Sequence, residues 1–283
     1  MALKVLLTND DGPESPLIAP FAEALAAAPW CEELRVVVPA QERSWIAKAI
    51  TKFDPLTVKE HRFGSVAGHV VATAGGSAGT PADCVELGLW NLYSERADLV
   101  VSGINVGVNA GRAFVLSSGT VGGTIEGLLN QVPGLALSAT VPREVFAQWT
   151  DGSFRDPALV EHWQRVVRVG VAVCGSLIAR DFAAKAKLLS INLPWAAEET
   201  TPVRLTRLKE TFYKGVFEAD PERPATYRHR FRGLADAPDR ASESGLPADL
   251  DVIARGEISV SAFDQVVATL EDPELVELVE RTR

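Results

Sequence analysis

The 283-residue sequence contains few cysteines, few histidines and no long apolar run. Cys31, Cys84 and Cys174 are widely spaced and form no CxxC pair, so they suit buried reduced thiols better than a disulfide framework or a zinc site. Only four histidines are present, and none accompanies a serine or cysteine signature of nucleophilic catalysis. No apolar segment approaches the roughly 20 residues that a membrane-spanning helix needs. Because Asp10 and Asp11 follow the first short apolar run directly, a secretory signal is not indicated and we expect a cytoplasmic protein.

The charge balance and two missing motifs exclude further classes of function. The formal net charge is -9, which repels polyanions, so we expect no nucleic-acid partner and no membrane partner. Neither GxGxxG nor GxxxxGK[ST] occurs in the sequence. A nicotinamide-dependent oxidoreductase and a P-loop nucleotidase are therefore unsupported, and a small anionic substrate has to be bound by local groups.

Short apolar runs alternate with helical patterns through the first two thirds of the chain. The runs at 4–8 and 34–38 flank an amphipathic stretch that contains Leu17, Phe21 and Leu25, which predicts strand, helix and parallel strand. The same alternation predicts further strands at 97–102, 134–138 and 188–193, with helices at 83–90, 121–131 and 163–182. We expect an α/β fold with a Rossmann-like, doubly wound and mainly parallel sheet.

The alternation of strand and helix patterns ends near Val203, where short segments typical of antiparallel strands begin. A strand-like run at 258–263 and a helical tail end the sequence. We therefore expect a catalytic core at 1–200 and a C-terminal, β-rich extension at 201–283. Within the extension Arg228, Arg230 and Arg232 alternate along a possible strand; they form a solvated face or reach a neighbouring subunit, and the solvated face is favoured.

A carboxamide and two carboxylates follow the first predicted strand as Asn9, Asp10 and Asp11, before Gly12. Oxygen donors of this kind favour a hard divalent cation such as Mg²⁺ or Mn²⁺. Capping of the next helix is the simpler explanation for an isolated Asp-Asp-Gly. The carboxyl end of the first strand of an open sheet is nevertheless a place where ligands bind, which favours a functional role.

Two further loops follow predicted strands or precede predicted helices. The segment after the strand at 97–102 carries Asn105 and Asn109 between glycines, which suits either close approach to a ligand or a simple turn. Ser118, Gly119 and Thr120 precede the helix at 121–131, where freed N–H groups favour an anion; Thr120 as a plain helix cap is the alternative. A cation loop and an anion loop at one edge together indicate metal-assisted phosphoryl chemistry.

A glycine-rich loop enters the helix at 83–90. Thr80 is expected as its cap, Pro81 as its first residue, and Asp83 as compensation of the helix dipole rather than as a catalytic group.

Four ordered segments resemble the signature blocks of the SurE family, the stationary-phase survival proteins. They are Leu6 to Gly12, Gly79 to Val85, Ser102 to Gly111, and Ser118 to Gly127. The resemblance implies a metal-dependent 5′-nucleotidase acting on nucleoside monophosphates, 3′-monophosphates among them. It also implies one divalent cation per subunit, a Rossmann-like core, and a C-terminal extension exchanged between the subunits of a homodimer or homotetramer.

The resemblance also assigns roles to individual residues. The implied metal ligands are Asp10, Asp11, Ser44 and Asn105. The implied phosphate site consists of Asn109, Ser118, Gly119 and Thr120. Asn9 is implied to orient the loop or the attacking water.

Three positions around these residues depart from the family pattern. Trp45 stands in place of a glycine, Val106 in place of a histidine, and Ser117 in place of a tyrosine. Trp45 would stack on a base, narrow the entrance or be inert surface. These departures leave an alternative to the nucleotidase, which is a non-catalytic or specificity-shifted relative that binds a nucleotide or another phosphate. A second alternative is a phosphatase with an aspartate nucleophile, which also has an acidic residue at the end of the first strand. Such a phosphatase normally has its second aspartate two residues on, whereas here the two are adjacent.

Overall fold

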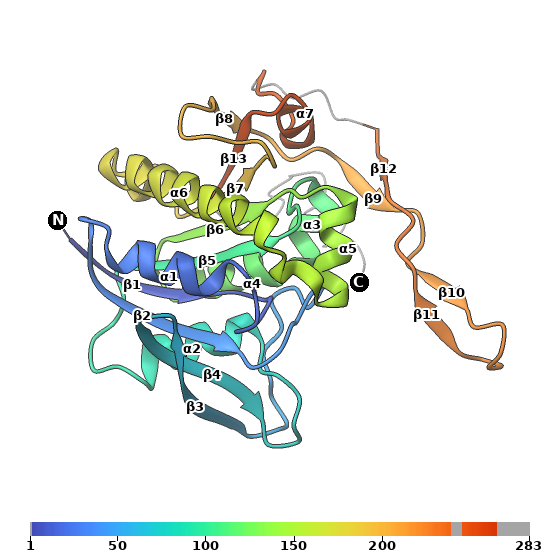
Figure 1. Cartoon of the computed structure of the whole chain (residues 1–283), viewed down its shortest axis with the longest axis horizontal. Helices are drawn as coiled ribbons and strands as arrows, with labels where there is room; N and C mark the ends of the chain where they lie inside the picture. Colours follow the sequence, from blue (N-terminus) through green and yellow to red (C-terminus); the bar gives the residue numbers. More distant parts are fainter. Residues whose placement is uncertain (1, 239–244, 265–283) are drawn as a thin grey trace, which may run out of the picture.

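The computed structural model describes residues 2–238 and 245–264, and its centre is a nine-stranded sheet (Figure 1). Its strands are β1 (Leu3–Thr8), β2 (Cys31–Pro39), β3 (Leu56–Phe63), β4 (Val66–Thr73), β5 (Leu99–Val106), β6 (Gly134–Ala139), β7 (Leu188–Leu193), β8 (Val203–Thr206) and β13 (Ile258–Phe263). The helices are α1 (Ile18–Ala26), α2 (Pro81–Trp90), α3 (Arg112–Ser117), α4 (Gly119–Leu129), α5 (Arg143–Asp151), α6 (Pro157–Ala179) and α7 (Asp249–Ala254). The helical tail expected after 263 lies outside the described residues.

The strands run in the order β3-β4-β2-β1-β5-β6-β7-β13-β8. Every neighbouring pair is parallel except β3 on β4 and β13 on β7. The order reverses at β1, because β2 lies on one side of it and β5 on the other. The predicted α/β class with a doubly wound, mainly parallel sheet is confirmed, and the carboxyl ends of β1 and β5 are adjacent at this switch point.

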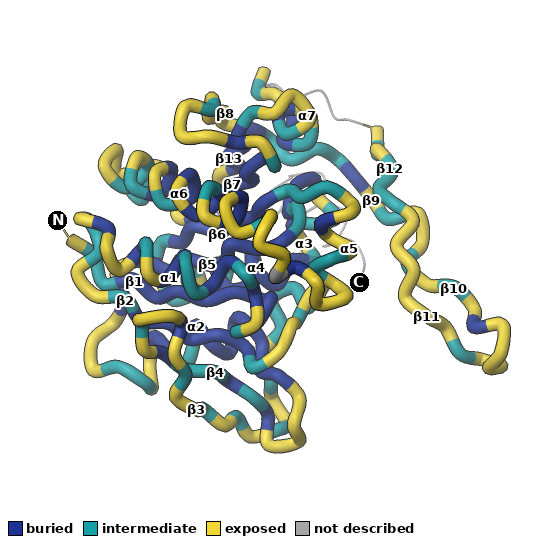
Figure 2. Tube along the Cα trace, viewed as in Figure 1, coloured by how far each residue is buried: buried dark blue, intermediate teal, exposed yellow. Residues whose placement is uncertain are grey.

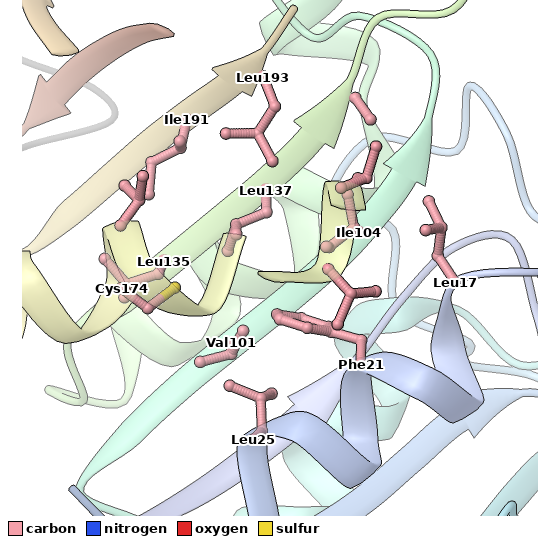
Figure 3. Close-up of a cluster of buried hydrophobic side chains, with 14 of the residues drawn as sticks. Leu17, Phe21, Leu25, Val101, Ile104, Leu135, Leu137, Cys174, Ile191 and Leu193 are labelled. Atoms are coloured by element: carbon pink, nitrogen blue, oxygen red, sulfur yellow. The ribbon is translucent and has the colours of Figure 1, made fainter. Parts of the chain in front are cut away.

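Both faces of the sheet are covered by helices, so its strands are apolar on both sides. In β1, Val5 and Leu7 face the side of α1 and α6, whereas Leu6 faces the side of α2. On the first side Phe21 of α1 and Cys174 of α6 pack over the strands (Figure 3). Continuous apolar strands of this kind are the pattern that burial on two faces requires.

The cysteines agree with the expected reduced thiols. Cys84 and Cys174 are buried, Cys31 is half-buried, and all three are free. Burial raises the pKa of the Cys174 thiol to about 12, so this thiol stays protonated and inert.

The region beyond residue 200 contributes both to the sheet and to a projecting segment, residues 211–236, which we call the arm. β8 and β13 extend the central sheet, while β9 (Thr211–Tyr213) pairs with β12 (Leu234–Asp236), and β10 (Phe217–Ala219) pairs with β11 (Tyr227–His229). The β10–β11 hairpin stands away from the body in Figure 1 and is largely exposed in Figure 2. The division of the chain at residue 200 remains a prediction.

The three arginines of this arm lie on its exposed surface. Arg228 pairs with Asp220, and Arg230 and Arg232 both pair with Glu218 of the same hairpin. Within one chain they form a solvated face, which is the arrangement that the sequence favours. Their ion-pair partners are carboxylates of the arm itself.

Several helix boundaries differ from the expectation, and some elements were not predicted. α4 begins at Gly119, two residues earlier than expected, and α6 at Pro157, six residues earlier, because each starts directly after a capping side chain, Ser118 or Asp156. α2 begins at Pro81, directly after the expected cap Thr80. The β3–β4 hairpin, α3 and α5 lacked a clear periodic pattern in the sequence. Among the described residues, no helix is both long and apolar enough to cross a bilayer.

One buried histidine makes the stability of this core depend on pH. His162 of α6 stacks on Trp195, and its Nδ1 accepts a hydrogen bond of 2.8 Å from the Arg165 guanidinium. Burial, with the charge of Arg165 as the second cause, lowers the pKa of His162 from 6.5 to about 4. Because the folded pKa is the lower one, the unfolded chain binds the proton first, and stability falls as the pH drops from about 6.5 to about 4.

We expect His162→Phe to reduce this acid-dependent loss, which amounts to at most about 3 kcal/mol for a shift of this size. Urea unfolding at pH 7 and pH 4.5 measures it. His61→Gln, on the β3 strand, is the control and should keep the slope of the unmodified protein. An identical pH slope in His162→Phe and the unmodified protein would contradict the assignment.

Candidate active site

The loop after β1 is held by its own residues and brings two carboxylates into the interior. The Asn9 side chain donates to the Gly12 carbonyl at 2.9 Å and accepts from the Gly12 amide at 3.2 Å. Gly12 has a φ of +77°, and a Cβ there would lie 3.0 Å from the Gln41 backbone, so glycine is required. Asp10 and Asp11 are each only 3% exposed. With both its polar atoms on Gly12, Asn9 holds the shape of this loop.

The side chain of Asp10 points to the start of α4. Its carboxylate accepts a hydrogen bond of 2.6 Å from the Thr120 hydroxyl. A Cβ on Gly119 would lie 2.8 Å from the Asp10 Cβ, so the helix approaches the carboxylate closely only because residue 119 is glycine. The helix cap is Ser118, whose hydroxyl accepts from the Val121 amide at 3.1 Å. The alternative role of Thr120 as the cap is therefore wrong, since its hydroxyl serves Asp10.

Asp11 points instead to the end of β5. Its carboxylate accepts a hydrogen bond of 2.9 Å from the backbone amide of Val106. The family pattern has a histidine at position 106, but this contact uses the backbone and does not depend on the side chain. Two adjacent aspartates thus connect β1 to α4 and to β5.

The electrostatics of this pair favour a cation. Burial raises the pKa of Asp10 to about 6, against a weaker opposing effect of the Thr120 hydrogen bond. Burial, and then the charge of Asp10, raise the pKa of Asp11 well above its usual value. Among the described residues, no lysine, arginine or histidine forms an ion pair with either carboxylate. A divalent cation would compensate the buried charge.

The predicted metal ligands fit an oxygen-coordinated cation. Ser44 and Asn105 line the same cavity as Asp10, and the amide of Arg43 donates to the Asp10 carbonyl at 2.7 Å, which fixes the Ser44 loop beside it. The Asn105 side chain donates its N–H to the Gly107 carbonyl at 3.0 Å, so its oxygen is the atom that could coordinate a cation. No cluster of three or more His, Cys, Asp or Glu that could hold a metal occurs in the described part of the chain. The donors here are two carboxylates plus neutral oxygens, which suit Mg²⁺ or Mn²⁺.

The predicted phosphate residues also meet at this edge of the sheet. Asn109 and Ser118 line the cavity beside Asp10. The Asn109 side chain donates to Ser138 at 2.9 Å and to Thr120 at 3.3 Å. Gly119 and Thr120 do not line the cavity. Thr120 holds two lining residues, Asp10 and Asn109, by hydrogen bonds, and Gly119 lets α4 approach Asp10 closely.

Three polar residues that the sequence analysis did not single out hold this arrangement. Asn192 clamps the backbone of Asn109, accepting from its amide at 2.9 Å and donating to its carbonyl at 3.2 Å. Ser138 binds the Asn109 side chain, and Asp249 accepts from the Gly111 amide at 2.6 Å. Ser138 and Asn192 are polar residues near the carboxyl ends of apolar strands, which is the signal that could have identified them.

The cavity has a volume of about 470 Å³, and aromatic rings line much of it. Trp45, Phe114 and Phe231 lie among the lining residues, together with Phe146 and His229. Trp45 is therefore neither remote from the site nor inert surface. Sequence reasoning missed the other rings because they lie on α3, α5 and the arm, far apart in the chain.

Asp83 is structural, as expected. Its carboxylate accepts from the Thr80 amide at 2.9 Å, while the Thr80 hydroxyl accepts from the Asp83 amide at 3.0 Å. The two form a capping box at the start of α2, with Pro81 as the first helical residue.

Comparison with known proteins relates this geometry to a family. A sequence model described as "Survival protein SurE" matches residues 5–215. A protein named 5′-nucleotidase SurE from Methanosarcina barkeri is 30% identical over 264 residues, covering 92% of this chain and 91% of the relative. A second, of the same name, from Desulforudis audaxviator is 35% identical over 242 residues, covering 84% and 83%.

The solved structures agree at the level of the fold. The crystal structure of the SurE protein from Aquifex aeolicus aligns with a TM-score of 0.70 at 24% identity, covering 98% of this chain and 99% of that one. The family match runs through every predicted metal and phosphate residue, and the relatives align over most of both chains. On the strength of that match and those alignments, this chain belongs to the SurE family.

Proposed function

We propose that this protein is a metal-dependent phosphomonoesterase that hydrolyses nucleoside 5′-monophosphates to nucleoside and phosphate. The observation that carries the proposal is the pair of adjacent buried carboxylates, Asp10 and Asp11, of which Asp10 lines a cavity together with Asn109 and Ser118. Two relatives named 5′-nucleotidase SurE, aligned over most of this chain, support the substrate class. We extend the proposal to 3′-monophosphates as secondary substrates, because the proposed polar contacts are to the phosphate group, which both isomers carry.

The proposed metal ligands are Asp10, Asp11, Ser44 and Asn105, and the cation is Mg²⁺ or Mn²⁺. A divalent cation in this position supplies charge stabilisation at the phosphoryl oxygens during transfer. The hydrogen bonds from Thr120 to Asp10 and from Val106 to Asp11 orient the two carboxylates before a cation arrives. Such orientation reduces the reorganisation that binding would otherwise require.

The chain's own groups then position the substrate. The Ser118 hydroxyl offers a hydrogen bond to the phosphate, at the amino end of α4 where the helix dipole favours negative charge. Asn109 would bind the phosphate by exchanging its longer contact to Thr120, of 3.3 Å, because both of its side-chain N–H groups already donate, to Ser138 and to Thr120. In the reaction an O–P bond forms to a water oxygen while the bond to the sugar oxygen breaks. One proton of the water ends on the leaving sugar oxygen, which releases the nucleoside.

We further propose that the chain acts as a homodimer or homotetramer through its C-terminal arm. Phe217 and Tyr227 of the β10–β11 hairpin are 68% and 66% exposed, and contacts with a second subunit would cover them. The hairpin stands away from its own chain in Figure 1, as an exchanged segment would.

The first test is phosphate release from nucleoside 5′- and 3′-monophosphates with Mn²⁺, Mg²⁺ or EDTA. We expect activity only with a divalent cation, and a loss of at least about 100-fold in Asp10→Asn and Asp11→Asn, because each removes a buried charge that holds the cation. Asp181→Asn, an exposed acid near the amino ends of β1 and β5, is the matched control and should keep full activity.

Full activity in both Asp10→Asn and Asp11→Asn would refute the metal assignment. If activity with EDTA equals that with Mn²⁺, the same conclusion holds. Trapping of a covalent phosphoenzyme after acid quench would instead support the aspartate-nucleophile alternative.

The second test concerns the close approach of α4 to Asp10. Gly119→Ala places a Cβ 2.8 Å from the Asp10 Cβ, and Gly127→Ala on the same helix places one 2.8 Å from Val100 in the apolar core. Both should lose stability, by about 1–3 kcal/mol for overpacking of this kind. Only Gly119→Ala should also bind Mn²⁺ at least about 10-fold more weakly, because it displaces a carboxylate.

Thermal unfolding and calorimetric titration with Mn²⁺ separate the two effects. An equal loss of Mn²⁺ affinity in both variants would show that the effect is general destabilisation and not displacement of Asp10.

A further inference from the structure

Five ring side chains gather on one side of the cavity. Trp45 stacks on Tyr213, with ring centroids 4.7 Å apart and an interplanar angle of 29°. Edge-on contacts join Trp45 to Phe114 at 6.0 Å, to His229 at 4.9 Å and to Phe231 at 5.8 Å. We call Trp45, Phe114, His229 and Phe231, which all line the cavity, the aromatic wall.

Tyr213 supports the aromatic wall by stacking on Trp45. It does not itself line the cavity. Its hydroxyl donates to the Ala113 carbonyl at 2.7 Å and shares a 2.5 Å hydrogen bond with the Ser117 hydroxyl. Ser117, which departs from the family's tyrosine, is thus the contact that fixes another tyrosine behind Trp45.

The wall and the proposed phosphate site belong to one cavity. Asp10, Asn109 and Ser118 line it together with the aromatic wall, and Val141 and Phe146 add further apolar surface. Trp45 is 38% exposed and Phe231 is 42% exposed, so both rings are accessible to a ligand. The cavity volume of about 470 Å³ lies within the range of roughly 300–1,000 Å³ that is usual for small-molecule sites.

We propose that the aromatic wall, centred on Trp45, is a stacking surface for the planar aromatic group of the phosphomonoester, so that the enzyme discriminates for nucleotides against sugar phosphates without a base. This inference rests on the proposed function and names the part of the substrate that the site selects. Trp45, the centre of the wall, occupies a position where the family pattern has a glycine.

Stacking of a base on an aromatic side chain is the physical basis of the proposal. It is tolerant of base identity because every base has a π-face, so the wall selects for the presence of a base and not for one base. The two substrates that isolate this effect are adenosine 5′-monophosphate and ribose 5-phosphate, which share the phosphate and the sugar and differ by the base.

The variant Trp45→Gly tests the wall directly. Trp45 has a φ of +59°, so glycine removes the ring without straining the backbone. We expect the kcat/KM ratio of adenosine monophosphate over ribose 5-phosphate to fall by about 10-fold, within the range measured for base–aromatic stacking. The loss should be larger for adenosine monophosphate than for ribose 5-phosphate, which has no base to stack on the ring.

Two further variants serve as controls. Trp45→Phe retains a ring and should restore most of the ratio. Phe53→Ala removes a phenyl ring that is 91% exposed and does not line the cavity, so it should leave the ratio unchanged. A ratio that stays constant in Trp45→Gly, or falls equally in Phe53→Ala, overturns the proposal.

Binding without turnover separates this inference from the proposed function. Calorimetric titration with adenosine and with ribose should show binding of adenosine that weakens about 10-fold in Trp45→Gly, with no need for a metal or for catalysis. If neither phosphate ester is hydrolysed while adenosine binding depends on Trp45, the proposed function fails and the stacking surface stands. If both are hydrolysed and adenosine binds equally to the variant, the stacking surface is wrong and the enzyme stands.

Discussion

The burial of two adjacent carboxylates at the end of β1 is the constraint on which the site depends. Burial opposes the charged form of Asp10 and Asp11, and the hydrogen bonds that stabilise the two carboxylates come from neutral donors, among them the Thr120 hydroxyl and the Val106 amide. The sheet must therefore bring β5 and α4 close to this one loop. The switch point of a doubly wound sheet does so, because strand order reverses at β1. The strand order of the fold thus provides the hydrogen-bond donors that the two buried carboxylates need.

Much of this was predictable where the information is local. Apolar runs such as Val5–Leu7 predict strands because burial on two faces needs continuous apolar sequence. The loop at Asp10 could be predicted to lie at the ligand-binding edge of the sheet because a parallel strand fixes where its carboxyl end lies. The start of α4 was predicted two residues too late, because the capping side chain of Ser118 determines where the helix begins and the apolar period does not.

The rest depended on contacts between distant parts of the chain. Asn192 reaches Asn109 across 83 residues, and Asp249 reaches Gly111 across 138. Neither pairing leaves a trace in local sequence. The aromatic wall has the same origin, since Trp45 meets Phe231 only because the arm returns beside the core. Short irregular elements such as α3 carry too few residues for a periodic pattern to identify them.

The position of β13 gives the arm a particular character. β13 lies between β7 and β8 in the sheet, and Val203 of β8 is in register with Ile258 of β13. The two hairpins are therefore an insertion anchored at both of its ends in the sheet, and not a loose tail. Its length and sequence are free to vary between relatives without moving a strand of the core. Evolution can thus alter the exposed hairpin, and the ring at 231 that lines the cavity, independently of the buried carboxylates at the end of β1.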